Sequence, residues 1–462
     1  MTEVTIRIED TQDGYRKLIQ CKALPQYRVV GDTVITDELS YAAVFGGMVH
    51  SVEMVDAPHL LDFQESVTRE ALCRKRYAAL LDCGLGKTAL ELAWAYSVAT
   101  IGKVLFLCPL SVFEQIIRES ERWHGTKPVN LRRGEPWESG VAILNYEARR
   151  EIDMTGVAGI IIDEASILKN DTGATRDWLC ALSSSVEYRL TASATPAPND
   201  QEEYASQAVF LGLAKTSKEF YARFFRKDGN KWVIKGWARE AFYKYLATWA
   251  TYIKSPSSLG YSCMTEMMEE PDYLFLSVDG GGAPTPELGL FPTSEDGAFR
   301  AAVFGALRSD KDSPRTKAVV DFCTGHKTIV WCSRNSEEKM FSQLLERSVV
   351  INGQTPVEDR VVAMADWRAG KYDHLISKPT VLGFGVNLPE ADRMAYSGYT
   401  YSFEQFYQAV RRAHRFGRTG RLKVLVPVMF PEVPVVNSLR RKMGTFDRDV
   451  MELQSRMARV NK

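Results

Sequence analysis

Uninterrupted apolar runs alternate with longer helical stretches from residue 56 onwards, and the alternation occurs in two separate sets. A strand without polar positions has to be buried on both faces, which favours a parallel sheet covered by helices. The pattern therefore predicts an α/β protein with two parallel-sheet domains in tandem. The runs of the first set are AALL (78–81), VLFLC (104–108), VAIL (141–144), GIII (159–162) and YRLT (188–191), and those of the second are TIVWC (328–332), VVIN (349–352), HLIS (374–377), RMAYS (393–397) and KVLVPVM (423–429).

The segments around these two sets differ in pattern. The first 55 residues carry short alternating runs such as VTIRI and TVIT, which predict a small β-rich appendage or edge strands of the sheet that follows. A helical, aromatic-rich stretch follows the first set, and DGGGAPTPELGLFP (279–292) is typical of a linker. We divide the chain into an appendage (1–55), a first sheet domain (56–212), a helical protrusion (213–255), a linker (256–299), a second sheet domain (300–435) and a C-terminal amphipathic helix (436–462).

The C-terminal stretch repeats apolar residues at spacings of three and four, from Val436 to Val460, which places them on one face of a long helix. A helix that packs back on the domains is the favoured interpretation, and a dimerising coiled coil is the alternative. Gly444 costs about 1 kcal/mol relative to Ala in a helix and weakens the coiled-coil case. We therefore expect a monomer.

Composition excludes several classes of protein. With 58 basic and 58 acidic residues the net charge is zero, which argues against a protein that coats nucleic acid by bulk charge. No apolar run approaches the roughly 20 residues of a membrane span, and the start MTEVTIRIED does not resemble a signal peptide. The eight cysteines include no C-x-x-C pair, so we expect neither a zinc site nor a disulfide framework. A cytoplasmic protein is the expectation.

A candidate phosphate-binding loop follows the first apolar strand, at LLDCGLGKT (80–88). The strict pattern G-x-x-x-x-G-K-[ST] has a glycine where this chain has Leu81. Gly84 and Gly86 permit close approach of the backbone to phosphate, Lys87 supplies positive charge, and Thr88 supplies a hydroxyl for Mg²⁺. By itself the stretch leaves open a plain glycine turn before a helix.

Two adjacent carboxylates end another strand of the same predicted sheet, in GIIIDEAS (159–166). Asp163 is placed to hold Mg²⁺ through its water shell, and Glu164 to polarise the water that attacks a γ-phosphate. A solvated acidic turn is the alternative, which the four preceding apolar residues disfavour.

Arginines gather near the end of the second set, in QAVRRAHRFGRTGR (408–421). Phosphoryl transfer needs positive charge on its transition state, and an arginine often supplies it. On a helix, Arg412 and Arg415 would share one face, with Gln408 one turn earlier. A solvated basic helix face is the alternative.

Taken in order, these segments resemble the motifs of superfamily 2 helicases of the Swi/Snf type, over about residues 56–430. The loop resembles the D-E-M-G-L-G-K-T form of that group, which also lacks the first glycine, and DEASILKN (163–170) resembles D-E-A-H-x-x-K-N. Further stretches that resemble motifs are LLDFQES (60–66, the glutamine motif), CPLSVFEQ (108–115, Ia), ILNYE (143–147, Ib), LTASATPAPND (190–200, III), TIVWCSR (328–334, IV), GFGVNLPEA (383–391, V) and QAVRRAHRFG (408–417, VI).

The chain departs from this pattern at three positions. Ser166 replaces the histidine that in relatives helps to couple the ATP site to motif III, and Arg411 and Arg418 replace the acidic residue and the glutamine usual in motif VI. The region between motifs III and IV is compact and lacks the large insertions of remodellers, which argues against a dedicated nucleosome enzyme.

The resemblance implies two RecA-like lobes that use ATP and Mg²⁺. It assigns catalysis to Lys87, Asp163, Glu164, Gln408, Arg412 and Arg415, and Mg²⁺ to Thr88 and Asp163. ATP binding is assigned to Gln64, Gly84, Leu85, Gly86, Lys87, Thr88 and Gly385, and coupling to Ser193 and Thr195. Nucleic-acid contacts are assigned to Ser111, Asn145, Tyr146, Ser333, Arg334, Ser377 and Asn387.

The leading functional hypothesis is an ATP-dependent DNA helicase or translocase that acts on duplex, forked or branched DNA, in a compact bacterial or phage form that serves genome maintenance. The Ser193-Ala194-Thr195 spelling of motif III supports an alternative, an RNA helicase related to the DEAD-box group. A third hypothesis is an ATP-gated clamp or recruitment module that binds nucleic acid without moving along it. For the protrusion, a packed helical element is favoured over a strand-separating wedge.

Overall fold

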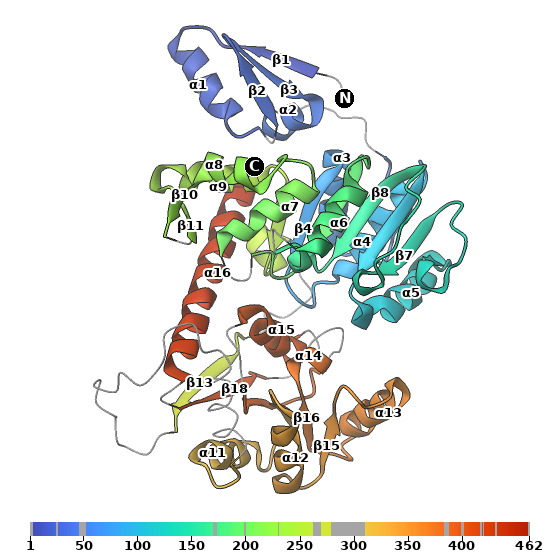
Figure 1. Cartoon of the computed structure of the whole chain (residues 1–462), viewed down its shortest axis with the longest axis vertical. Coiled ribbons are helices and arrows are strands. Elements are labelled where there is room, and N and C mark those ends of the chain that lie inside the picture. Colours follow the sequence, from blue (N-terminus) through green and yellow to red (C-terminus); the bar gives the residue numbers. More distant parts are fainter. Residues whose placement is uncertain are drawn as a thin grey trace. The chain divides into compact units, whose positions relative to one another are not determined.

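The computed structural model describes residues 3–24, 26–45, 52–169, 173–197, 200–229, 231–261, 269–278, 310–382, 388–398, 402–415, 418, 420–429 and 432–460. The chain forms two compact units. The first comprises Met1–Cys263 and Thr445–Lys462, and the second comprises Met264–Gly444. Figure 1 labels the helices and strands of both units.

A seven-stranded sheet forms the core of the first unit, in the order β12-β4-β9-β8-β5-β7-β6. All its neighbouring strands pair in parallel. Every residue of β7 and of β9 is buried, as expected of strands covered on both faces. The strands are β4 (Arg76–Leu81), β5 (Lys103–Cys108), β6 (Val129–Asn130), β7 (Val141–Asn145), β8 (Val157–Asp163), β9 (Tyr188–Ala192) and β12 (Ala250–Ile253).

Helices cover this sheet (Figure 1). Helix α4 packs against β5, β8 and β9, and its Trp94 is fully buried beside strand residues such as Phe106 and Ile161. This apolar contact fixes the start of α4 at the sheet edge where the candidate loop lies. The helices between residues 62 and 247 are α3 (Asp62–Arg74), α4 (Lys87–Val98), α5 (Leu110–His124), α6 (Ala174–Ser183), α7 (Tyr204–Phe210), α8 (Ser217–Phe224) and α9 (Arg239–Ala247).

The second unit is built on a six-stranded sheet in the order β13-β18-β17-β14-β16-β15, again with parallel pairs throughout. Its strands are β13 (Asp272–Ser277), β14 (Thr328–Trp331), β15 (Ser348–Ile351), β16 (His374–Ser377), β17 (Arg393–Tyr396) and β18 (Lys423–Val428). Its helices are α11 (Pro314–Cys323), α12 (Asn335–Leu344), α13 (Val357–Arg368), α14 (Pro379–Leu382) and α15 (Phe403–Ala413). The prediction of two parallel-sheet α/β domains is thus confirmed.

Two segments differ from their predicted structure. The stretch 213–255 is not helical throughout, because β10 (Phe225–Asp228) and β11 (Lys231–Ile234) form an antiparallel hairpin and β12 joins the large sheet beside β4. The stretch 256–299, predicted as a linker, contributes β13, which pairs with β18. Both β12 and β13 are edge strands. Strand β12 has only four residues, one of them Thr251, so it shows no long apolar run, whereas β13 contains the apolar run YLFL, which the prediction did not use.

The N-terminal residues form a sheet of their own, in the antiparallel order β1-β3-β2, and do not extend the large sheet within the described residues. Its small core contains Ile6, Cys21, Leu24 and Val34. Arg223 of α8 donates from Nη2 to the carbonyl oxygen of Leu24 (2.9 Å), which joins this sheet to the protrusion. The elements are β1 (Glu3–Arg7), α1 (Gln12–Cys21), β2 (Tyr27–Val30), β3 (Thr33–Asp37) and α2 (Glu38–Phe45).

The last helix, α16 (Val433–Val460), has residues in both units. Its apolar stripe is buried within the single chain at Val436, Leu439, Phe446, Val450 and Leu453, as expected of a helix that packs back on its own domains. In the first unit, the hydroxyl of Tyr243 donates to Oδ1 of Asp449 (2.6 Å). Among the described helices, α16 included, none combines the length and the apolar character that a membrane span requires.

A buried ion pair holds the start of this helix to the second unit. Arg315 of α11 and Glu432 are 0% and 2% exposed in their side chains, and Arg315 also donates to the carbonyl oxygen of Pro427 (3.0 Å). Two charges this deeply buried stabilise the fold only as a pair, because either one alone would be left desolvated.

We expect Arg315→Ala to lower the free energy of unfolding of the second unit by about 3–5 kcal/mol, because it leaves Glu432 charged and buried without its partner. Urea unfolding followed by circular dichroism measures the change. Lys317→Ala, an exposed change on the same helix, should stay within about 0.5 kcal/mol of the parent. Equal unfolding curves for both variants would show that the ion pair contributes nothing.

Candidate nucleotide site and nucleic-acid interface

The order of strands in the first unit brings three of the predicted segments together. Strands β4, β9 and β8 are neighbours and parallel, so their carboxyl ends lie at the same edge of the sheet. The loop 82–86 follows β4, Ser193 follows β9, and Asp163 ends β8. Ligands of open parallel sheets bind at this kind of edge. The structure therefore places the loop, the acidic pair and motif III side by side.

The backbone of the loop has the conformation that its glycines permit. Gly84 and Gly86 have φ angles of 87° and 69°, and α4 begins at Lys87, directly after Gly86. A Cβ atom at Gly86 would lie 2.3 Å from Nε2 of Gln64 and would displace that side chain from the loop, and the φ angle would strain any larger residue. The first N–H groups of α4 have no partner inside the helix and, with its dipole, favour an anion at this end.

Gln64 is bonded to this loop rather than open to solvent. Its Nε2 donates to the carbonyl oxygen of Leu85 (2.9 Å), and its Oε1 accepts the N–H of Leu61 (2.8 Å). The second contact is the glutamine half of a capping box at the start of α3. Gln64 therefore links the position of α3 to the shape of the loop, and its assignment to ATP binding stays a prediction.

Lys87 lies among carboxylates. Its Nζ donates to the carbonyl oxygen of Leu81 (3.3 Å), and Thr88 beside it is partly exposed. Burial alone would lower the pKa of Lys87. The nearby negative charges of Glu164, Asp163 and Glu91 outweigh this effect, so the pKa lies above its ordinary value. The ammonium group is therefore held charged at the loop, as phosphate binding requires.

The acidic pair is arranged by the backbone at the end of β8. Oδ1 of Asp163 accepts the N–H of Glu164 (2.9 Å), and Glu164 has a φ angle of 54°, in the left-handed region that residues other than glycine seldom adopt. Burial raises the pKa of Asp163 to about 7, with a further contribution from the charge of Glu164. One carboxylate oxygen of Glu164 is buried and has no hydrogen-bond partner among the described residues. Strain and an unpaired acceptor of this kind are typical of functional sites.

Sequence reasoning missed a third acidic residue, Glu91, one turn after Lys87 on α4. Glu91 is fully buried, and neither of its oxygens accepts an N–H or O–H from a described residue. Its carboxyl group instead lies against the carboxyl group of Asp163. Burial, together with the negative charge of Asp163, raises the pKa of Glu91 well above its ordinary value. A charged residue at a buried position of an otherwise apolar helix, ALELAWA, was the signal that would have found it.

Motif III adds two buried hydroxyl residues at the same edge. The Oγ of Ser193 accepts the N–H of Thr195 (3.1 Å), and the Thr195 hydroxyl is buried with no hydrogen-bond partner among the described residues. Ser166, which stands where the family has histidine, is buried in the turn after the acidic pair. The coupling role of Ser193 and Thr195 stays a prediction.

The donors at this edge fit Mg²⁺ bound with a nucleotide. No group of three or more His, Cys, Asp or Glu side chains within the described ranges is arranged to hold a metal ion by itself. Mg²⁺ usually keeps several waters and takes only one or two protein carboxylates together with phosphate oxygens. The hydroxyl of Thr88, the carboxylate of Asp163 and the unpaired oxygens of Glu164 and Glu91 suit such a partly hydrated ion.

The predicted nucleic-acid contacts of the first unit are only partly accessible. Ser111 is exposed in the first turn of α5. Asn145 and Tyr146 are 2% and 4% exposed, so their side chains offer little surface to a nucleic acid in this conformation, and their assignment stays a prediction. Asn145 donates from Nδ2 to Glu147 (2.7 Å), and burial raises the pKa of Tyr146, which lies near Asp163.

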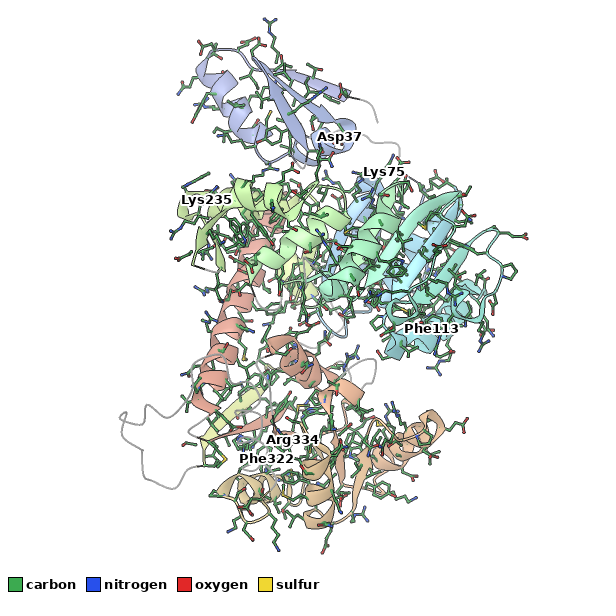
Figure 2. All side chains as sticks on the ribbon, in the orientation of Figure 1. Asp37, Lys75, Phe113, Lys235, Phe322 and Arg334 are labelled. Atoms are coloured by element: carbon green, nitrogen blue, oxygen red, sulfur yellow. The ribbon has the colours of Figure 1, made fainter. Side chains whose placement is uncertain are left out.

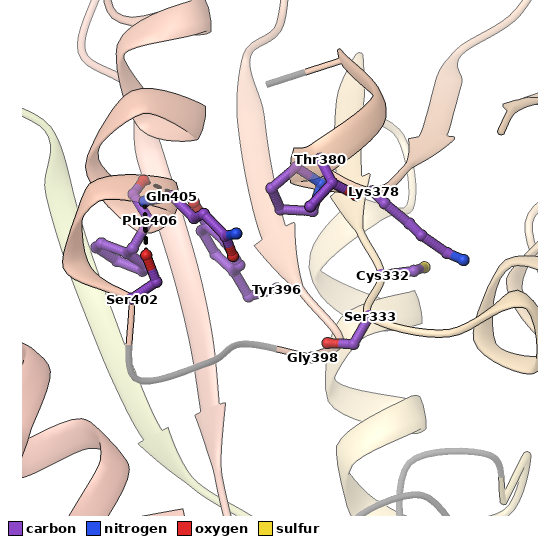
Figure 3. Close-up of a pocket in the computed structure, with 10 residues that line it drawn as sticks. Cys332, Ser333, Lys378, Thr380, Tyr396, Gly398, Ser402, Gln405 and Phe406 are labelled. Carbon is purple, nitrogen blue, oxygen red and sulfur yellow. Dashed lines mark hydrogen bonds between the residues drawn. The ribbon is translucent and has the colours of Figure 1, made fainter. Parts of the chain in front are cut away.

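In the second unit, a pocket opens at the carboxyl ends of β14, β16 and β17 (Figure 3). Ser333 lines it, and Arg334 beside it is exposed. Ser377 is fully buried, where its hydroxyl donates to the carbonyl oxygen of Ile351 (2.5 Å), so a side-chain contact with nucleic acid is not available to it. The predicted residues Gly385 and Asn387 lie outside the described residues.

This pocket also contains polar residues that sequence reasoning did not select. Lys378 and Thr380 follow β16, and Gln405 comes from α15, whose first turn is capped by Ser402 (Figure 3). The signal was present for Lys378 and Thr380, because they directly follow an apolar run, at the position where strand ends supply site residues.

The arginines of motif VI do not share a helix face as predicted. Helix α15 contains Gln408 and Arg412 but ends at Ala413, so Arg415 lies in the segment that follows. His414 follows the last helical residue with non-helical backbone angles (φ −82°, ψ 80°), and its ring contacts Arg411 at Nδ1 and the carbonyl oxygen of Glu269 at Nε2 (2.9 Å). Gln408 and Arg412 are 1% and 6% exposed. Their assignment to catalysis stays a prediction.

The raised pKa of Asp163 predicts how the stability of the first unit depends on pH. A carboxyl group that binds its proton more tightly when folded stabilises the fold below its unfolded pKa of about 4 and loses that contribution as pH rises through about 7. Relative to Asp163→Asn, the wild-type free energy of unfolding should therefore fall by up to about 1.4 kcal/mol per pH unit in this window. Urea unfolding of both proteins between pH 5 and pH 8 measures it. Parallel profiles would contradict the assignment.

Comparison with known proteins identifies one domain family. Residues 315–417 match the helicase conserved C-terminal domain. No curated protein matches the chain. Among solved structures, the chain is similar to the SWI2/SNF2 ATPase core of Sulfolobus solfataricus in complex with double-stranded DNA, with 16% identity and a TM-score of 0.43 over 89% of this chain and 96% of that one. It is also similar to Dbp5 of S. cerevisiae bound to RNA and ADP BeF3, with 13% identity and a TM-score of 0.47 over 92% of this chain and 98% of that one. With TM-scores below 0.5, neither structural similarity bears on activity. The family match, in contrast, places a helicase C-terminal domain within the second unit.

Proposed function

We propose that the chain is an ATP-driven motor that acts on nucleic acid, with DNA as its substrate. The observation that carries this proposal is the edge of the first sheet, where Lys87 lies at a helix start beside the carboxylates of Asp163 and Glu164. The match of residues 315–417 to a helicase C-terminal domain supports it independently. An isolated nucleotide-binding domain would have no need of this second domain.

In this proposal the residues of the first unit divide the work of ATP hydrolysis. The loop around Gly84 and Gly86 holds phosphate oxygens with backbone N–H groups, and Lys87 neutralises their charge. Thr88 and Asp163 hold Mg²⁺, which when bound offsets the negative charge on the phosphates. Glu164 accepts a proton from the attacking water, because its buried oxygen has no competing donor among the described residues.

We favour DNA as the substrate, and the Swi/Snf type of motor, because of the amino-acid sequences of the motifs, above all GFGVNLPEA and QAVRRAHRFG. We extend the proposal to Gln408, Arg412 and Arg415, which would stabilise charge on the transferred phosphoryl group. RNA is the second candidate substrate, favoured by the Ser193-Ala194-Thr195 spelling of motif III. An ATP-gated clamp requires the same nucleotide site but no movement along the strand.

We expect Glu164→Gln to lower the rate of ATP hydrolysis by about 10²–10⁴-fold while ATP still binds, because the change removes the proton acceptor but no phosphate contact. Steady-state hydrolysis by the full chain is measured without nucleic acid and with single-stranded, duplex and forked DNA or structured RNA. Glu151→Gln, an exposed change in the same unit, serves as the matched control.

Each result has a distinct meaning. Stimulation by DNA that Glu164→Gln abolishes supports the DNA motor, whereas stimulation by RNA alone replaces it with the RNA helicase. Hydrolysis that no nucleic acid stimulates contradicts a motor of either kind. Equal rates for the Glu164→Gln and Glu151→Gln variants would remove Glu164 from the mechanism.

A further inference from the structure

The β10–β11 hairpin and the turn after it form a basic segment in a neutral chain. Residues 226–239 contain five basic residues and one acidic residue, whereas the whole chain has a net charge of zero. Arg226 and Lys227 on β10 are exposed, and neither has an ion-pair partner among the described residues. Positive charge concentrated on one exposed ribbon is the electrostatic footprint of a polyanion site.

The hairpin is held in place by its inner face. Phe225 is buried in the aromatic cluster of the protrusion, and the ring of Trp232 stacks on that of Tyr221 with centroids 4.8 Å apart. Arg226 pairs across the hairpin with Val233, which is also exposed, so these two side chains share the outer face. Lys227 pairs with Trp232 and so lies on the opposite face of the ribbon from Arg226, although its side chain is exposed as well. The contacts of Phe225 and Trp232 therefore fix the ribbon, with one exposed cation on each of its faces.

Trp237 follows the hairpin and is 78% exposed, more than any other exposed large apolar side chain among the described residues. It lies in the short turn Gly236–Ala238. The Nζ of Lys235 lies 5.4 Å from the centre of its ring and donates to the carbonyl oxygen of Ala222 (2.7 Å). Lys235, labelled in Figure 2, thus orients the indole from one side while most of its surface stays open. A single exposed apolar residue is ordinary, but an exposed indole in contact with a cation and within a basic segment suggests a binding surface.

We propose that this segment is a second nucleic-acid site, which binds a single-stranded stretch by stacking an unpaired base on Trp237 and placing backbone phosphates against Arg226 and Lys227. Aromatic stacking combined with basic side chains is how proteins bind single strands without reading sequence. A duplex does not present base faces to an indole, so the site favours single strands or the open arm of a fork. The inference rests on the proposed function and adds the class of strand to it.

The test is the binding of a fluorescently labelled single-stranded DNA to the full chain, measured by anisotropy at several salt concentrations. We expect Trp237→Ala to weaken binding about tenfold and Trp237→Phe to keep most of it, because phenylalanine preserves a stacking surface. Arg226→Ala with Lys227→Ala should reduce the slope of log affinity against log salt by about 1.4, or about 0.7 for each lost phosphate contact. Affinity for a blunt duplex should change little in Trp237→Ala.

Lys215→Ala with Lys218→Ala, two exposed lysines at the start of α8, is the matched control for loss of charge and should leave the slope near the parent value. ATP hydrolysis without nucleic acid, unchanged in every variant, shows that the fold is intact. If the wild type binds single strands but the Trp237→Ala and Arg226→Ala/Lys227→Ala variants bind equally well, the hairpin site is wrong and the proposed function stands. If the wild type binds no nucleic acid, the proposed function fails and this inference fails with it.

Discussion

Parallel pairing of β4, β9 and β8 is the constraint on which the candidate site depends. Parallel strands direct all their carboxyl ends to one edge, so residues more than a hundred positions apart in sequence meet there without any specific attraction between them. The apolar strands stabilise the sheet, and polar residues begin where each strand leaves it. Lys87, Asp163, Glu164 and Thr195 are therefore neighbours because the chain between them is buried, and the chemistry follows from the packing.

Burial of these groups also makes an excess of negative charge at this edge energetically unfavourable. Three carboxyl groups, those of Glu91, Asp163 and Glu164, surround one ammonium group in a place with little water. Without further cations the negative charges disfavour one another, which is why Asp163 and Glu91 hold protons more tightly than exposed carboxyl groups do. In the absence of a bound cation, these clustered carboxyl groups lower the stability of the folded protein. The arrangement becomes favourable in a protein that receives a cation with its substrate, and this contrast distinguishes the site from an ordinary surface cluster.

Much of this fold was predictable from sequence, and the exceptions have physical causes. Strands such as β8, which is apolar up to its final residue Asp163, and the polar residues at their ends identify the sheets and the candidate site edge without a structure. Strand β12 is too short, with Thr251 inside it, to show a continuous apolar pattern and was assigned to the protrusion, and β13 was assigned to the linker although it contains the run YLFL. The helix at motif VI was extended past its end because residue spacing alone does not reveal that the backbone leaves the helical conformation at His414. Asn145 and Tyr146 were selected by motif, which carries no information about burial.

Helix α16 gives the protein an unusual order of assembly. The first unit consists of Met1–Cys263 and of residues from Thr445 onwards, so the whole second unit is synthesised before the first is complete. Until Asp449 leaves the ribosome, the Tyr243 hydroxyl lacks its partner and the surface that will receive Phe446 and Val450 is exposed to solvent. A nascent chain of this kind carries an unfinished first unit while the whole second unit is being synthesised. The first unit therefore cannot finish folding until the chain has been synthesised as far as Leu453, because Phe446, Val450 and Leu453 are part of its buried core.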